Sequence, residues 1–101
     1  MGRSHSEPQV LRPYHRLEAM TVLEGAEASG RTPRTVRGWC QSYDLGRRVG
    51  GRWALSRIAL AMYLDGDGDA LSAYLGGDRI SPEVVAYFDR CSVPLPKRGA
   101  A

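Results

Sequence analysis

The chain has 101 residues, 43% of them hydrophobic and 25% charged, with a formal net charge of +3. This is the length and composition of one globular domain with a small core, for which self-association is no surprise. The longest apolar run, from Ile58 to Leu64, is too short to span a bilayer, and residues 1–16 lack the apolar stretch of a secretory signal. Cys40 and Cys91 lack the spacing of a metal site or a disulfide framework, so we expect a cytoplasmic protein with reduced cysteines, no membrane partner and no metal.

The positive charge is concentrated in one segment. From Arg31 to Arg57 the chain has seven arginines and one acid, Asp44, whereas nearly all the other acids lie before or after this segment. A basic segment between acidic flanks is typical of a site that binds a polyanion such as a nucleic acid. The alternative is a solvated basic surface with no such partner.

Residues 1–16 contain serine, proline and charge without periodicity, which predicts a mobile N-terminal arm. We expect one domain over residues 17–92 and a disordered tail over residues 93–101. The first helix is predicted to begin after Thr21, because Thr21 and Glu24 have the spacing of a capping box. It should end at Gly30 and bury an apolar stripe formed by Val22, Leu23 and Ala26.

Thr32 and Pro33 predict the start of a second helix. Its apolar residues recur at helical spacing and predict a buried face: Val36, Trp39, Cys40 and Tyr43. The other side carries a polar set: Arg34, Thr35, Arg37 and Gln41. Two short helices joined by about three residues, the second with a polar face, are typical of a helix-turn-helix.

The stretch GRRVGGRWAL, residues 46–55, predicts a hairpin with Gly50 and Gly51 in its turn. The expected register pairs Val49 with Arg52, Arg48 with Trp53 and Arg47 with Ala54. Trp53 and Leu55 then face the core, Arg47 and Arg52 point outward, and Arg48 lies across the indole of Trp53. A hairpin directly after such a helix is a wing, whose arginines contact phosphates or the minor groove.

Three short helices are predicted after the hairpin: Arg57 to about Leu64 with Ser56 as its cap, residues 70–75, and one that starts at Ser81-Pro82. Residues 65–69, DGDGD, resemble the start of a calcium loop, but Ala70 and Gly76 replace the required glycine and glutamate, so a solvated break is expected. The predicted fold class is mainly α with a small β-hairpin, a winged helix-turn-helix plus two short C-terminal helices.

The stretches TVLEGAEASGRTPRTVRGWC and LGRRVGGRWALSR resemble the winged-helix DNA-binding modules of the MerR superfamily, and are most similar to excisionases, the recombination directionality factors of integrative elements and prophages. The resemblance implies that the second helix enters the major groove and the wing contacts the adjacent minor groove or backbone. Its groove-facing set would be Thr32, Arg34, Thr35, Arg37 and Gln41, and its wing contacts Arg47, Arg48 and Arg52. Arg37 could instead form a surface ion pair with Glu27 or Asp44, and Trp39 and Trp53 are assigned to the core.

The resemblance implies a nucleoid-associated protein that needs no cofactor. We expect no enzyme, because His5 and His15 lie in the predicted arm, no nucleophile sits in a recognisable motif and the only carboxylate cluster is the DGDGD stretch. Excisionases bind double-stranded DNA cooperatively and bend it, so that an integrase (a tyrosine or serine recombinase) favours excision. MerR-type activators differ, because their wing is followed by a long dimerising coiled coil that this chain lacks. Two alternatives stay open, a small terminase subunit for phage DNA packaging and a winged-helix transcription repressor.

Overall fold

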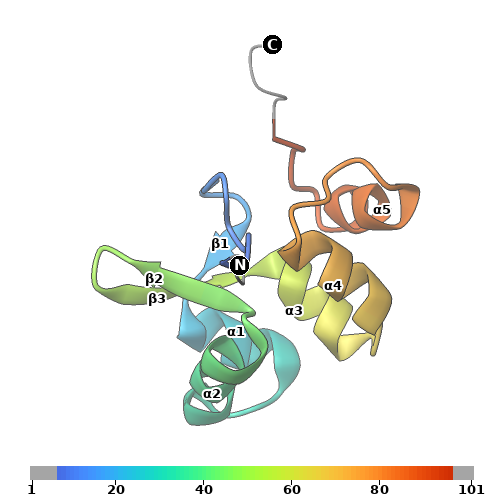
Figure 1. Ribbon diagram of the computed structural model, residues 1–101. Coiled ribbons are helices and arrows are strands. Elements are labelled where there is room, and N and C mark those ends of the chain that lie inside the picture. Colours follow the sequence, from blue (N-terminus) through green and yellow to red (C-terminus); the bar gives the residue numbers. More distant parts are fainter. Residues whose placement is uncertain (1–6, 97–101) are drawn as a thin grey trace, which may run out of the picture.

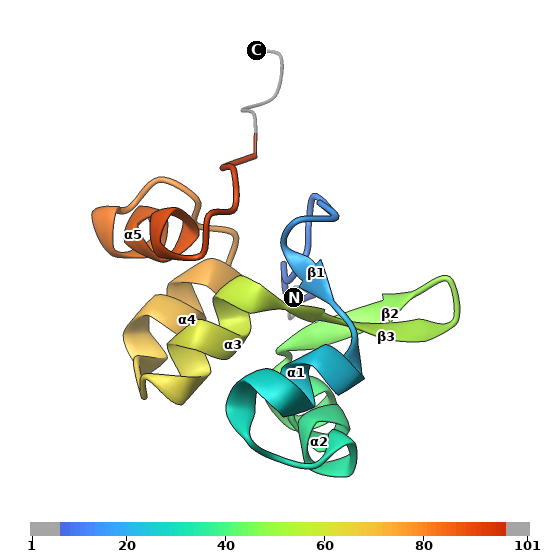
Figure 2. The same ribbon diagram turned by 180° about the vertical axis from the view of Figure 1, so that it is seen from behind.

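The computed structural model describes residues 7–96 and contains five helices and a three-stranded antiparallel sheet of order β1-β3-β2. The bounds are β1 Ala19–Met20, α1 Val22–Ser29, α2 Pro33–Tyr43, β2 Gly46–Val49, β3 Arg52–Ser56, α3 Arg57–Leu64, α4 Gly68–Leu75 and α5 Pro82–Arg90. Figures 1 and 2 show α1 and α2 together beside the sheet, while α3, α4 and α5 gather at its far end. The β2–β3 hairpin projects away from all five helices.

Local capping chemistry explains where the first two helices begin and end. The Thr21 hydroxyl accepts from the Glu24 amide at 3.0 Å and the Glu24 carboxylate accepts from the Thr21 amide at 2.8 Å, which confirms the capping box. Gly30 ends α1 in the left-handed conformation with φ of 73°. The Thr32 hydroxyl then accepts from the Thr35 amide at 3.1 Å, and Pro33 opens α2 as predicted.

The buried face of α1 differs from the predicted stripe. Leu23 is 67% exposed, whereas Gly25 and Ala26 are buried. A β-carbon on Gly25 would lie 2.2 Å from Leu55 Cδ2, so this glycine provides the space in which the fully buried Leu55 packs against α1. A small residue at the contact allows α1 to approach β3 closely, which a count of large apolar residues does not reveal.

The hairpin has the predicted turn and register. Gly50 and Gly51 have φ of 60° and 84°, the left-handed values that a two-residue hairpin turn requires. Arg48 pairs with Trp53, and the neighbouring pairs follow the same register. Leu55 is fully buried at the base of the hairpin, while Trp53 is half-buried nearer the turn.

The prediction of a mobile arm over residues 1–16 is wrong for residues 7–16; residues 1–6 lie outside the described residues. Val10 and Leu11 are buried in the core with 2% and 0% of their surface exposed. The Gln9 amide donates to the Leu75 carbonyl at 2.8 Å, which ties the segment to α4. The chain then enters β1, an unpredicted strand whose Met20 pairs with Leu55 of β3.

A buried polar junction connects this N-terminal segment to the C-terminal helices. Glu18 is only 3% exposed, and its carboxylate accepts from the Ser56 hydroxyl at 2.5 Å and from the Tyr74 hydroxyl. The Tyr74 oxygen in turn accepts from the Leu11 amide at 3.0 Å. Burial and the adjacent Glu18 carboxylate raise the pKa of Tyr74 above its ordinary range, so its hydroxyl stays protonated and donates to Glu18.

The C-terminal helices form where the sequence predicts them, and α3, α4 and α5 pack on one another. The DGDGD stretch is more ordered than predicted, because Asp67 caps α4 through the Ala70 amide at 3.1 Å. Tyr87 donates to Asp65 at 2.9 Å and so joins α5 to the end of α3. The predicted tail over residues 93–101 is wrong at its first residue, since Val93 is 5% exposed and packs in the core, and residues 97–101 lie outside the described residues.

Candidate nucleic-acid interface

One face of α2 presents a row of polar side chains that have no partners within residues 7–96. Arg34, Arg37 and Gln41 lie at i, i+3 and i+7 and are all exposed. Within residues 7–96 none of the three side chains makes a hydrogen bond or an ion pair, so the alternative pairing of Arg37 with Glu27 or Asp44 does not occur. Guanidinium and amide groups in such a row can donate to phosphate or to base edges.

The first turn of α2 is arranged differently from the rest of this face. The hydroxyls of Thr32 and Thr35 bond to each other at 3.0 Å, and Thr32 also caps the helix. The Arg31 guanidinium lies 5.9 Å from the centre of the Trp39 ring, within the range of a cation–π contact. The two threonines therefore define the start of the helix, and Arg34 and Arg37 supply the donors that have no partner within residues 7–96.

The three hairpin arginines have three different environments. Arg52 is exposed at the start of β3, and its side chain makes no hydrogen bond or ion pair within residues 7–96. Arg48 donates to the Gly51 carbonyl at 2.9 Å and lies 5.2 Å from the centre of the Trp53 ring, the predicted stacking. One exposed cation thus extends freely from the hairpin, and a second stays close to its turn.

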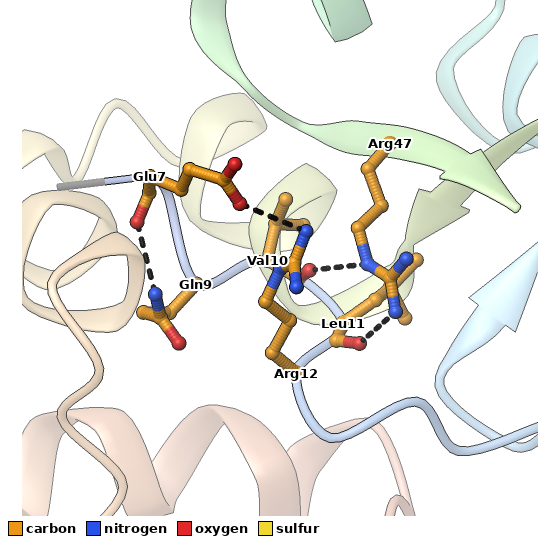
Figure 3. A network of polar contacts seen from close by, with 6 residues as sticks. All are labelled: Glu7, Gln9, Val10, Leu11, Arg12 and Arg47. Carbon is orange, nitrogen blue, oxygen red and sulfur yellow. Dashed lines mark hydrogen bonds and ion pairs between the residues drawn. The ribbon is translucent and has the colours of Figure 1, made fainter.

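Arg47 does not point freely outward as predicted. Its Nε donates to the Val10 carbonyl at 3.2 Å and its Nη2 donates to the Leu11 carbonyl at 2.9 Å (Figure 3). The guanidinium satisfies backbone acceptors of the N-terminal segment that no strand partner reaches. Arg47 is therefore a positioning residue that holds residues 10 and 11 against β2, since the packed segment occupies the side of the hairpin that the sequence pattern leaves open.

The aromatic residues of α2 pack toward α3. Trp39 is half-buried and its ring centre lies 4.8 Å from that of Tyr63. Tyr43 stacks on Tyr63 at 5.2 Å, yet it is 49% exposed and so is not part of the fully buried face predicted for α2. Val36 and Cys40 are the buried members of that face. This packing leaves the opposite side of the helix, with its arginines, exposed to solvent.

A groove of about 440 Å³ separates the end of α2 from the hairpin and the N-terminal segment. Gln41 of the polar row and Arg48 of the hairpin both line it, as do Arg12 and Cys40. Burial raises the pKa of the Cys40 thiol to about 11, so this cysteine is neutral at physiological pH. The groove therefore brings together Gln41 and Arg48, which the sequence predicts to lie in one interface. It also contains Arg12, for which the sequence predicts no contact.

A group of acids lies on the three C-terminal helices. Asp65, Asp69 and Glu83 belong to the ends of α3, α4 and α5, on the opposite side of the molecule from the hairpin tip (Figures 1 and 2). Hydrogen bonds from Arg90 and Tyr87 lower the pKa of Asp65, which keeps it charged. These acids thus lie away from the hairpin tip, whereas Glu7 and Asp44 lie at the groove itself, and an uneven charge distribution of this kind can orient a protein in the field of a polyanion.

Comparisons with protein-family models, with curated proteins and with solved structures gave no match. Within residues 7–96 no helix is long and apolar enough to cross a membrane. In the same part of the chain, His, Cys, Asp and Glu side chains form no cluster of three or more that could hold a metal ion. The candidate interface thus rests on the geometry and charge of α2, the hairpin and the groove between them.

Proposed function

We propose that this protein binds double-stranded DNA as a non-catalytic architectural factor of excisionase type, with α1, α2 and the β2–β3 hairpin acting as a winged helix-turn-helix. The observation that supports this most is the row of Arg34, Arg37 and Gln41 on α2, exposed and without intramolecular partners. An α-helix fits the major groove of B-DNA, where arginine can contact guanine and glutamine can contact adenine through two hydrogen bonds each.

In this proposal Arg52 supplies the wing contact, because it is the hairpin arginine without a partner within the described residues. Arg48 contributes charge beside Trp53, while Arg47 acts indirectly through the segment it holds. Thr32 and Thr35 define the N-terminus of α2, where the backbone N–H of Arg34 can meet a phosphate.

No long helix follows the hairpin in the part of the chain that the structure describes, which favours an architectural role over ligand-dependent activation. Helix α3 has eight residues, and the chain then turns back into α4 within residues 7–96. Several protomers bound side by side would share the cost of bending a site, which is on the order of 1–6 kcal/mol. Direction of an integrase toward excision would follow from the bent complex.

Selection of bound duplexes from a randomised DNA pool, at low and at moderate salt, tests the proposal. We expect a short motif that recurs in tandem about one helical turn apart. A single palindrome would favour a dimeric repressor instead, and a closed ring in light scattering would favour a terminase subunit. Failure to retain any DNA at low salt would overturn DNA binding altogether.

Substitutions separate the roles of helix and hairpin. Arg34→Ala and Arg37→Ala should relax sequence preference, each by about 1–3 kcal/mol at one base pair. Arg52→Ala should weaken all sequences alike and reduce the salt slope by about 1. Arg90→Ala on α5 is the charge-matched control, and equal losses of specific and random binding in all the test variants would contradict the assignment.

A further inference from the structure

The segment that contains Arg12 is held rigidly beside the hairpin. Arg47 donates to the carbonyls of Val10 and Leu11, and Arg79 donates to the carbonyl of Gln9 at 2.6 Å. The side chains of Val10 and Leu11 are buried at the same place. Backbone hydrogen bonds from both sides, together with the buried side chains, fix where the next residue, Arg12, leaves the core.

The Arg12 side chain, unlike those of Arg47 and Arg79, is not committed to the fold. It is 44% exposed, and the one ion pair that it forms in the described part of the chain, at 3.1 Å, is with Glu7, which is itself 76% exposed. Figure 3 shows Arg12 reaching back toward Glu7 while Arg47 extends from β2 to the backbone of Val10 and Leu11. An exposed ion pair of this kind contributes about 0–1 kcal/mol, so a competing anion can replace the carboxylate.

The groove next to Arg12 continues the basic surface of α2 and the hairpin. Gln41, the last residue of the exposed row on α2, lines it together with Arg48 of β2 and Arg12 itself. Its cations are Arg12, Arg47 and Arg48, and its acids are Glu7 and Asp44. Two of these cations, Arg12 and Arg48, are exposed, so a phosphate backbone that passes from α2 to the hairpin can contact both of them.

We propose that Arg12 is a further contact to the DNA backbone, and that Glu7 occupies its guanidinium in the free protein where a phosphate replaces it in the complex. This inference rests on the proposed function, because it assigns one more phosphate contact to the same duplex. Carboxylate and phosphate oxygens accept from a guanidinium in the same bidentate manner, so the exchange keeps the hydrogen bonds of Arg12 satisfied. Residues 7–12 then form part of the interface, with Arg47 as the positioning residue beneath them.

The test measures binding of a labelled random-sequence duplex by fluorescence anisotropy across a salt series. Each phosphate contact contributes about 0.9 to the salt slope, so between about 50 and about 200 mM salt the affinity of Arg12→Ala should fall about 3.5-fold less than that of the wild type. Arg12→Lys should retain most of the wild-type slope, because it keeps the charge. The matched control is Arg90→Ala, which removes an ion-paired arginine that is 55% exposed, against 44% for Arg12, at the opposite end of the molecule; it should keep the full slope.

Glu7→Gln provides an independent readout with no loss of positive charge. Removing the competing carboxylate should tighten binding about two- to fivefold at low salt, the exchange value of an exposed ion pair. Equal salt slopes for Arg12→Ala and Arg90→Ala would overturn the proposed contact of Arg12 with DNA. An unchanged affinity of Glu7→Gln would overturn the competition between Glu7 and phosphate for Arg12. Neither result would contradict the proposed DNA binding by α2 and Arg52. No binding by the wild type would overturn the proposed function and this inference together.

Discussion

Replacing Arg47 by methionine tests whether this hairpin arginine serves the fold or contacts DNA directly. Methionine keeps an aliphatic stem against the sheet and removes the guanidinium, so the carbonyls of Val10 and Leu11 lose their two donors. Hydrogen bonds from charged donors each contribute about 1.5–3 kcal/mol, and because Arg47 is only half-buried the pair should contribute about 2–3 kcal/mol in total. For a domain of this size the melting temperature should fall by about 10–20 °C.

The matched control is Arg52→Met, the same substitution one strand away at an exposed side chain without a partner in the described residues. Its melting temperature should stay within about 2 °C of the wild type, whereas its affinity for DNA should drop. Thermal unfolding followed by circular dichroism, together with anisotropy at a temperature where both variants are folded, separates the two effects. Arg47→Met with the thermal stability of Arg52→Met would refute the positioning role that we derive from the hydrogen bonds.

Three further predictions concern the core. In urea unfolding, Gly25→Ala should lower the free energy of unfolding by about 1–3 kcal/mol, because its Cβ would lie 2.2 Å from a buried leucine side chain. The control Gly38→Ala has open space around it and should raise the free energy of unfolding by up to about 1 kcal/mol. Equal effects of the two substitutions would contradict the packing of α1. Tyr74→Phe should lower the free energy of unfolding by about 1–3 kcal/mol, since its hydroxyl serves a buried amide and a buried carboxylate, and Tyr43→Phe, at a half-exposed ring, is the control that should change little. Burial raises the pKa of Cys40 to about 11, so iodoacetamide should modify this thiol only through unfolding; rapid alkylation of the native protein would disprove its protection.

The sequence predicted those helix ends and turns that depend on residues close to one another in the chain. The caps at Thr21 and Thr32 and the turn at Gly50-Gly51 depend on residues within three positions of each other, and all three form as predicted. The hairpin register follows from the turn, because a two-residue loop determines which residues face each other. The exposed row on α2 follows from helical periodicity alone.

The errors share another origin, contacts between residues far apart in the chain. The Leu11 amide is hydrogen-bonded to Tyr74, and the Glu18 carboxylate is hydrogen-bonded to Ser56 and Tyr74. No local sequence pattern predicts these pairings. The outward direction of Arg47 was wrong because strand parity gives a face of the hairpin but not what covers it. The apolar dipeptide Val10-Leu11 within a polar stretch was the available signal for the packed segment, which also positions the next residue, Arg12.

The buried junction at Tyr74 limits which part of the chain can be transferred to another protein and still fold. Its hydroxyl joins residues before β1, the end of β3 and helix α4, so both halves of the chain contribute to one cooperative interior. A transplant of residues 21–57 alone would remove Glu18 and Tyr74 and so leave the buried Ser56 hydroxyl without these two partners. We therefore expect the exposed arginines of α2 and the hairpin to keep their arrangement only when the C-terminal helices are transferred with them, so residues 7–96 should move between genes as one block.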